Sequence, residues 1–226
     1  MVYHIACMNH WKEIFNDQID TILHSNIIND LHMIYISLLY NDYDDVSFIE
    51  KKIIGYDKFK IVYKSKNLNE YEFPALRLIK NIAIGGDCNI CYIHTKGVSI
   101  NENNMSFYHG SNDINHLKNC VNDWRKYMEY FILDNYKNCI DQLNIYDACG
   151  VNLVESPQKH FSGNFWWANS SYIKKLPDIH KIDISHRWNA EFWLGHSNGN
   201  FKNLYTTNAG YIENIKDNYK KFFNEI

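Results

Sequence analysis

The sequence predicts one α/β domain built on a central, mixed and mostly parallel β-sheet flanked by helices. Short apolar runs rich in Ile, Val and Tyr alternate along the chain with segments whose apolar residues recur at helical spacing. The chain shows no internal repeat and no linker-like stretch. Its 226 residues can bury one sizeable core but are too few for two full-sized domains. We therefore predict a single domain over residues 1–226.

The first half of the chain carries the clearest element signals. Four short apolar runs predict strands, at residues 2–8, 33–40, 60–64 and 90–95. Apolar residues at helical spacing predict a helix over 11–23. A second helix begins at Phe73, since Pro74 is tolerated in a first turn, and Gly85 with Gly86 ends it.

The second half is less regular. Residues 115–143 carry apolar positions three and four apart and predict one long helix. We expect a strand at 148–154, a short helix at 188–194, and a tail at 211–226 whose apolar stripe closes the core. The polar stretch 98–111 predicts a loop long enough to act as a lid.

Composition excludes several classes of protein. An aromatic content of 15% is too high for a disordered chain. A net charge of −3 gives no overall positive field, so we expect no nucleic-acid partner. No apolar run approaches the roughly 18 residues that cross a bilayer, and residues 1–15 lack the pattern of a signal peptide. We expect no membrane span.

The six cysteines are scattered through apolar surroundings and do not form a small disulfide framework. A reducing compartment, and hence a cytoplasmic location, is the simpler interpretation. Cys88 and Cys91 with His94 mimic a metal or redox motif. Because the segment is predicted to be a strand, we favour buried core thiols over either chemistry.

In parallel α/β sheets, ligands bind beyond the carboxyl ends of the strands. The strand predicted at 90–95 delivers His94, Thr95, Lys96 and Gly97 to that end. A lysine can meet phosphate as a point charge, a threonine as a donor, and a glycine allows close backbone approach. A strand end that merely becomes a solvated loop explains the segment equally well.

A second candidate segment places small polar residues before two tryptophans. Ser162, Gly163 and Asn164 directly precede Trp166 and Trp167. Aromatic surface combined with compact hydrogen-bonding groups suits a sugar ring, which has apolar faces and a rim of hydroxyls. Both tryptophans could instead be core residues. We expect one of them to be so, because neighbours on an extended segment face opposite ways.

The third candidate is Glu191, a lone carboxylate in an apolar and aromatic stretch. Such a group can serve as a general base, although a helix-capping or solvent-facing role is the ordinary alternative. Lys96, Arg125 and Arg187 could balance a diphosphate, or could be surface charges.

Five segments resemble a family of small glycosyltransferase domains found in bacterial polysaccharide clusters and in large DNA viruses. They are YIHTKGVS (92–99), VNDWRKYMEYF (121–131), YDACGVN (146–152), HFSGNFWWANSSYIKKLP (160–177) and AEFWLG (190–195). The resemblance is good over roughly residues 70–195. It implies a GT-A fold, one α/β domain with a Rossmann-like nucleotide-binding half. It also implies transfer of a sugar from a nucleotide diphosphate, with UDP favoured, to a glycan hydroxyl by inverting displacement.

The resemblance also assigns residues. Met8 and Asn9 would line the base and ribose, and the segment 162–164 together with Trp166 would face the donor sugar. Glu191 would deprotonate the acceptor hydroxyl, and His94, Lys96 and Arg125 would receive the leaving diphosphate.

The metal-binding Asp-x-Asp motif of wider GT-A enzymes reads His94-Thr95-Lys96 here. Either His94 keeps Mn²⁺ or Mg²⁺ with a reduced ligand set, which we favour, or Lys96 replaces the ion. A carbohydrate-binding module that has lost catalysis is the main alternative function. A nucleotidyltransferase ranks last, because its glycine-rich N-terminal loop is missing from this sequence. A viral member would work in the host cytoplasm.

Overall fold

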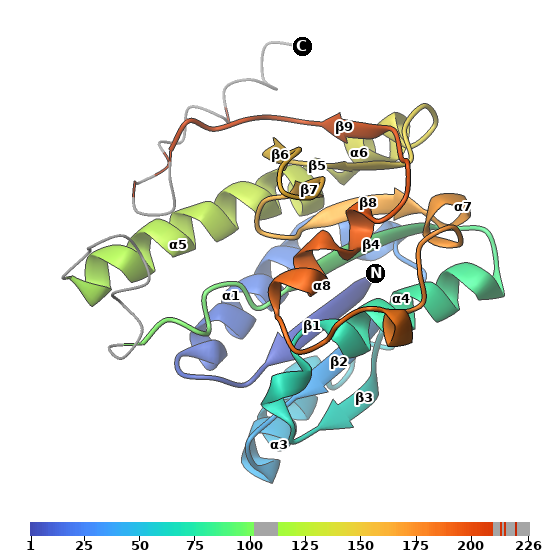
Figure 1. Ribbon diagram of the computed structural model, residues 1–226. Coiled ribbons are helices and arrows are strands. Elements are labelled where there is room, and N and C mark those ends of the chain that lie inside the picture. The colour runs from blue at the N-terminus through green and yellow to red at the C-terminus, as the bar shows by residue number, and fades with distance from the viewer. Residues whose placement is uncertain (102–112, 210–212, 214, 216–219, 221–226) are drawn as a thin grey trace.

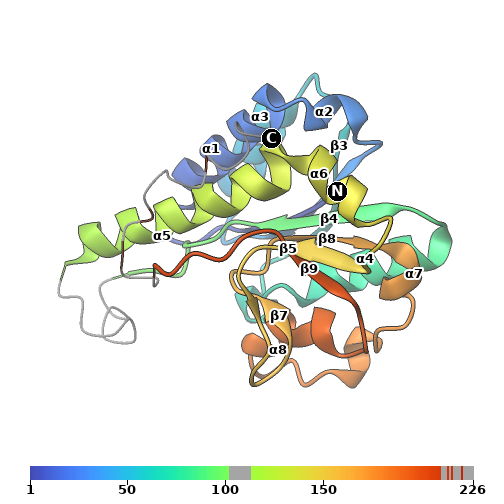
Figure 2. The same ribbon diagram turned by 90° about the horizontal axis from the view of Figure 1, so that it is seen from above.

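The computed structural model describes residues 1–101, 113–209, 213, 215 and 220, and shows a seven-stranded sheet with helices on both faces (Figures 1 and 2). The strand order is β3-β2-β1-β4-β8-β5-β9. Neighbouring strands run parallel except where β8 pairs with β4 and with β5. The predicted α/β fold with a mixed, mostly parallel sheet is confirmed.

The first half of the chain alternates strands and helices. Its elements are β1 (Val2–Ala6), α1 (Trp11–His24), α2 (Ile27–Asp30), β2 (Ile34–Leu39), α3 (Tyr43–Ile53), β3 (Phe59–Ser65), a 3-10 turn (Leu68–Glu70), α4 (Phe73–Gly85) and β4 (Asn89–His94). The four predicted strands and both predicted helices are confirmed. The sequence analysis missed α3, which starts with a capping box in which Asp42 and Asp45 each accept the other's backbone N–H.

The second half departs further from expectation. Its elements are α5 (Ile114–Glu129), a π-helical segment (Tyr130–Asp134), α6 (Tyr136–Gln142), β5 (Ala148–Gly150), β6 (Leu153–Val154), β7 (His160–Phe161), β8 (Trp166–Asn169), α7 (Ser170–Ile173), a 3-10 turn (Ile179–Lys181), α8 (Trp188–Phe192), a 3-10 turn (Trp193–Gly195) and β9 (Phe201–Asn203).

Two elements predicted in this half are each divided into shorter elements in the structure. The helix predicted over 115–143 is divided by the π-helical segment, where the Asn135 side chain donates to the Tyr130 carbonyl. The strand predicted over 148–154 is divided because Asn152 takes a left-handed conformation with φ 49°. As a result β5 joins the large sheet, while β6 pairs only with β7. Most of 98–111 and of 211–226 lies outside the described residues.

The sheet separates two apolar cores. The larger core lies under α1, α3, α5 and α6, and the smaller one under α4, α7 and α8 (Figure 2). Trp167 belongs to the first core and Trp166 to the second, at 3% and 0% exposure. The expectation that neighbouring tryptophans face opposite ways is confirmed, but the structure buries both of them.

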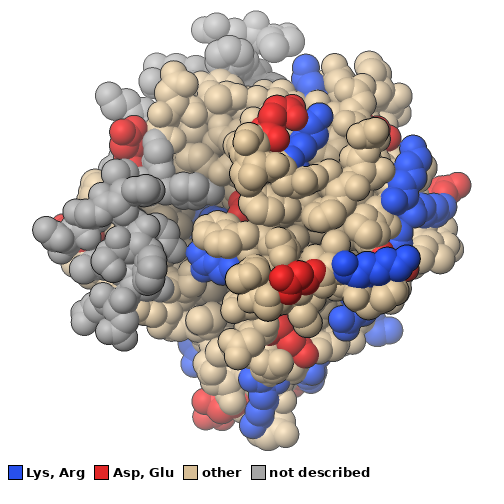
Figure 3. Space-filling model, viewed as in Figure 1, with Lys and Arg blue, Asp and Glu red and all other residues tan. Residues whose placement is uncertain are grey.

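The cysteine expectation is correct for Cys91, which is buried in β4, and wrong for Cys88, which is exposed just before that strand. All six cysteines are free thiols. Within the described ranges, none of the helices is long and apolar enough to span a membrane. Acidic and basic side chains are interspersed over the face seen in Figure 3.

The chain changes direction between β1 and β4. It leaves β1 toward β2 and β3 on one side, and then returns to place β4 on the other side of β1. The carboxyl ends of these four strands share one edge of the sheet (Figure 1). Because the strand order reverses there, this edge is the expected ligand crevice of a doubly wound sheet.

Two buried histidines lie side by side across β1 and β4, where His4 is the register partner of His94. Burial lowers the pKa of His4 to about 4 and the pKa of His94 to about 3, so both imidazoles are neutral at neutral pH. In the unfolded chain both would gain a proton as the pH falls through the ordinary value of 6.5.

We therefore expect acid to destabilise the fold before the carboxylates titrate. The unfolded state binds more protons below pH 6.5, so the free energy of unfolding should fall by about 1 kcal/mol for each of these histidines between pH 7 and pH 5.5. Urea unfolding at the two pH values measures the difference. His4→Gln should remove about half of it, and replacement of the exposed His32 should not change it. Equal stability at both pH values would contradict the assignment.

Candidate functional site

The ends of β1 and β4 are held together by side chains that close the ladder between them. The backbone N–H of Ala6 donates to Thr95 Oγ1 at 3.0 Å, and the Thr95 N–H donates to the His4 carbonyl at 3.0 Å. Gln18 on α1 donates to the His94 carbonyl at 3.1 Å and accepts from Tyr3. Thr95, predicted as a phosphate donor, is thus a buried residue whose hydroxyl oxygen fixes the crevice.

The residues after β1 also help to hold the ends of β1 and β4 together. Asn9 has φ 48°, a left-handed conformation that asparagine tolerates better than most residues. Its Nδ2 donates to the Val98 carbonyl at 2.6 Å, which ties the segment after β1 to the segment after β4. Met8 is half-buried against the larger core. Both predicted residues therefore lie at the switch point.

The Ser-Gly-Asn segment forms a turn between β7 and β8. Gly163 has φ 92° and Asn164 has φ 60°, two left-handed residues in succession. A Cβ atom on Gly163 would lie 2.4 Å from Met128 Sδ and 2.9 Å from Trp124 Nε1, so the turn needs glycine for space as well as for conformation. Ser162 is half-buried and its N–H donates to the Asn152 carbonyl.

Three predicted residues meet at this turn. Gly163 donates its N–H to Glu191 Oε1 at 2.8 Å, and its carbonyl lies 3.0 Å from His94 Nε2. Because a carbonyl only accepts hydrogen bonds, Nε2 of His94 carries a proton, and the lowered pKa of this residue makes the ring neutral. Burial is the main cause of its lowered pKa, and the nearby charge of Lys96 adds to it. The end of β4, the turn and α8 thus form one connected group.

Glu72 also belongs to this group, and the sequence analysis missed it. Its Oε2 accepts hydrogen bonds from Tyr92 Oη at 2.6 Å and from Asn164 Nδ2 at 2.7 Å. Trp166 Nε1 donates to Asn164 Oδ1 at 2.9 Å. Fully buried, Trp166 supports the turn from beneath and offers no open platform. The only sequence signal for Glu72 was its place before the proline-initiated helix α4, which is typical of an ordinary cap.

A cavity of about 230 Å³ lies between α1 and α5; Lys96, two residues after His94, lines it, whereas Gly163 and Glu191 do not. Its lining is rich in titratable side chains: His10, Glu13, Asp17, Lys96, Lys118 and Arg125. Burial lowers the pKa of His10, and the charges of Lys118 and Arg125 lower it further, while Glu13 opposes them. Lys118 has no ion-pair partner within the described ranges. The lining thus combines Lys96 and Lys118 with the carboxylates of Glu13 and Asp17.

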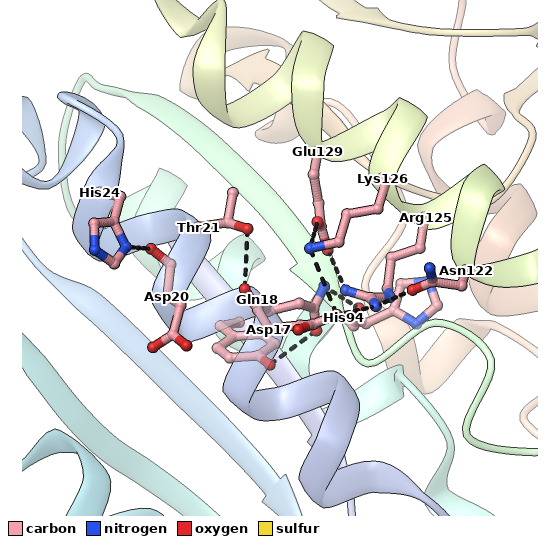
Figure 4. Close-up of polar contacts among 11 residues, drawn as sticks. Asp17, Gln18, Asp20, Thr21, His24, His94, Asn122, Arg125, Lys126 and Glu129 are labelled. Atoms are coloured by element: carbon pink, nitrogen blue, oxygen red, sulfur yellow. Dashed lines mark hydrogen bonds and ion pairs between the residues drawn. The ribbon is translucent and has the colours of Figure 1, made fainter. Parts of the chain in front are cut away.

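Arg125 lines this cavity, but its charge is already compensated (Figure 4). The guanidinium is 1% exposed and bonds Glu129 Oε1 and Asp17 Oδ2, each at 2.9 Å. Burial works against its charge, yet the two carboxylates raise the pKa of Arg125 above its ordinary value. The structure therefore shows Arg125 as a link between α5 and α1, with its cationic groups turned toward acids.

The His94-Thr95-Lys96 segment does not fit a divalent metal. The Nε2 of His94 is bound to a carbonyl, the Thr95 hydroxyl accepts from Ala6, and Lys96 carries a positive charge. In the part of the chain that the structure describes, no three His, Cys, Asp or Glu side chains are grouped to hold a metal ion. Lys96 itself lines the cavity between α1 and α5.

A larger cavity of about 620 Å³ lies at the opposite edge of the sheet, near the amino ends of β1, β2 and β4. Its lining is mainly apolar and includes Ile27, Leu31, Ile90 and Trp167. None of the predicted site residues reaches it. The charged cavity at the switch point is therefore the better candidate for a site that performs chemistry.

Comparison with known proteins gives a family but no described activity. No curated protein matches the chain. The crystal structure of HddC from Yersinia pseudotuberculosis is 13% identical to it and covers 91% of this chain and 90% of its own, with a TM-score of 0.43. The family described as Domain of unknown function (DUF8361) matches residues 6–188, which is most of the chain. The protein therefore belongs to the DUF8361 family.

Proposed function

We propose that the protein is a glycosyltransferase that moves a sugar from a nucleotide diphosphate, with UDP favoured, to a hydroxyl of a glycan acceptor. One observation carries this proposal. At the switch point, the end of β4 at His94, the left-handed turn at Gly163 and the carboxylate of Glu191 are joined by two hydrogen bonds. A charged cavity is lined by Lys96, two residues after His94. This arrangement offers a base and an anion pocket at one edge of the sheet.

The charged cavity suits the diphosphate of the donor. Lys96 and Lys118 supply positive charge there. Helix α1 starts at Trp11 next to His10, another residue of the lining, and no side chain caps this helix. The N–H groups of Trp11 and Glu13 already donate to the carbonyls of Met8 and His10, so what this helix offers a phosphate is its dipole. These cations and dipoles would stabilise the leaving diphosphate without any step through a metal ion.

Glu191 suits the role of general base. The Gly163 N–H fixes Oε1 at 2.8 Å, and Oε2 has no hydrogen-bond partner among the described residues. That oxygen can accept the proton of the acceptor hydroxyl while the hydroxyl oxygen attacks the anomeric carbon. The bond from this carbon to the diphosphate breaks on the opposite side, so the configuration inverts. The six free thiols fit a reducing compartment, so we also propose a cytoplasmic location.

Donor binding separates the enzyme from a carbohydrate-binding module. Thermal shift with UDP-, GDP- and dTDP-sugars should raise Tm, most with a UDP-sugar, and should do so in EDTA as well as in Mn²⁺. At a hundredfold excess over Kd the stabilisation is about 2.7 kcal/mol, or roughly 5–10 °C.

Lys118→Ala should weaken donor binding about tenfold, whereas replacement of the exposed Lys137 on α6 should not change it. A protein that is stabilised by free glycans and by no nucleotide sugar would instead be a binding module. Binding that requires Mn²⁺ would overturn the role given to the lysines.

Glu191→Gln should lower kcat by about 10²–10⁴-fold and leave donor binding unchanged. Glutamine keeps an oxygen that can accept from Gly163, so the turn should persist while the base is lost. The measurement is release of nucleoside diphosphate in the presence of glycan acceptors. Glu155→Gln, at an exposed site whose carboxylate pairs with Lys159, is the control. Full activity of Glu191→Gln would remove Glu191 from the mechanism.

A further inference from the structure

We infer that Glu72 is a positioning residue for transfer, which holds the Gly163–Asn164 turn in the conformation that presents Glu191. This inference rests on the proposed function. It concerns a residue on a different element from Glu191, since Glu72 lies immediately before α4 and Glu191 lies on α8.

Glu72 makes two short hydrogen bonds to buried donors. One carboxylate oxygen accepts two hydrogen bonds, at 2.6 Å from Tyr92 Oη and at 2.7 Å from Asn164 Nδ2. Distances this short are typical of hydrogen bonds to an ionised group. Both donors are shielded from water, because Tyr92 is fully buried and Asn164 is 3% exposed, while Glu72 itself is half-buried. Removing Glu72 would leave two buried donors without an acceptor.

Hydrogen bonds fix the orientation of the Asn164 side-chain amide. Its Oδ1 accepts from Trp166 Nε1 at 2.9 Å, which directs Nδ2 toward Glu72. The backbone of Asn164 is left-handed, a conformation that needs support from its surroundings in any residue other than glycine. Glu72 and Trp166 provide that support from opposite ends of one amide group.

The supported residue lies next to the residue that holds the base. Gly163 bonds both Glu191 and His94, and Asn164 follows it directly in the chain. Glu72 and Glu191 therefore act on successive residues of one turn. The charge of Glu72 acts to raise the pKa of His4, and the charge of Glu191 acts to raise the pKa of His94. These two histidines are register partners across β1 and β4. Both carboxylates thus lie close to the switch point.

Steady-state kinetics of three variants test this role. Glu72→Ala should lower kcat at least tenfold with little change in the donor KM, because the turn is misplaced while the charged cavity is untouched. Glu72→Gln should stay within threefold of the wild type, because its amide oxygen can accept both hydrogen bonds. Glu70→Ala is the matched control: Glu70 also accepts from a tyrosine, Tyr63, but it is not bonded to the turn.

Asn164→Gly provides a second route, since glycine keeps the left-handed backbone and loses the amide. Its kcat should match that of Glu72→Ala, and the double variant should be no slower. A loss in Glu72→Gln as large as that in Glu191→Gln would overturn positioning in favour of direct proton transfer. Additive losses in the double variant would overturn the link through Asn164.

The indole N–H resonance of Trp166 gives a readout that does not depend on activity. In ¹⁵N-labelled protein this resonance should shift in Glu72→Ala and remain in place in Glu72→Gln and Glu70→Ala. The resonance is assigned by its loss from the spectrum of Trp166→Phe. An unmoved resonance in Glu72→Ala would overturn the inference. If the wild type transfers no sugar while the resonance still shifts in Glu72→Ala, the proposed function is overturned and the role of Glu72 in holding the turn stands.

Discussion

The candidate site depends on the way in which the ends of β1 and β4 are held side by side. Parallel strands diverge freely once their ladder ends, and here the Thr95 hydroxyl extends the ladder by accepting from Ala6. Gln18 reaches from α1 to the His94 carbonyl and closes the junction from the face of the sheet. The strand order reverses at this junction, so the fold creates a crevice there and these contacts fix its shape.

The second constraint is the close approach of the Gly163 turn to α5. The backbone passes so near to Met128 and Trp124 that no Cβ fits, and two left-handed residues follow each other. Such a conformation persists only when its surroundings determine it. Here the surroundings are two carboxylates, from Glu72 and Glu191, and the neutral imidazole of His94. The apolar cores on both faces of the sheet hold these groups in place.

Sequence reasoning succeeded where the signal was local. The apolar runs, the proline of α4 and the strand position of His94 predicted the first half of the fold, whereas the contacts that join His94, Gly163 and Glu191 came only from the structure. It failed where a partner is distant in sequence.

Arg125 was expected to balance a diphosphate because it is a cation, and the structure pairs it with Glu129, four residues away, and with Asp17, 108 residues away. Glu72 lies 92 residues from Asn164, and nothing near either residue reports their contact. The break in the long helix was missed because the π-helical segment keeps apolar residues on its buried side.

The most direct test of the account is a crystal structure with a bound nucleoside diphosphate sugar. The account predicts the diphosphate in the cavity between α1 and α5, against Lys96 and Lys118, with the anomeric carbon directed toward Gly163 and Glu191. A nucleotide sugar seated in the apolar cavity at the opposite edge of the sheet, or anywhere remote from the β1–β4 junction, would contradict it.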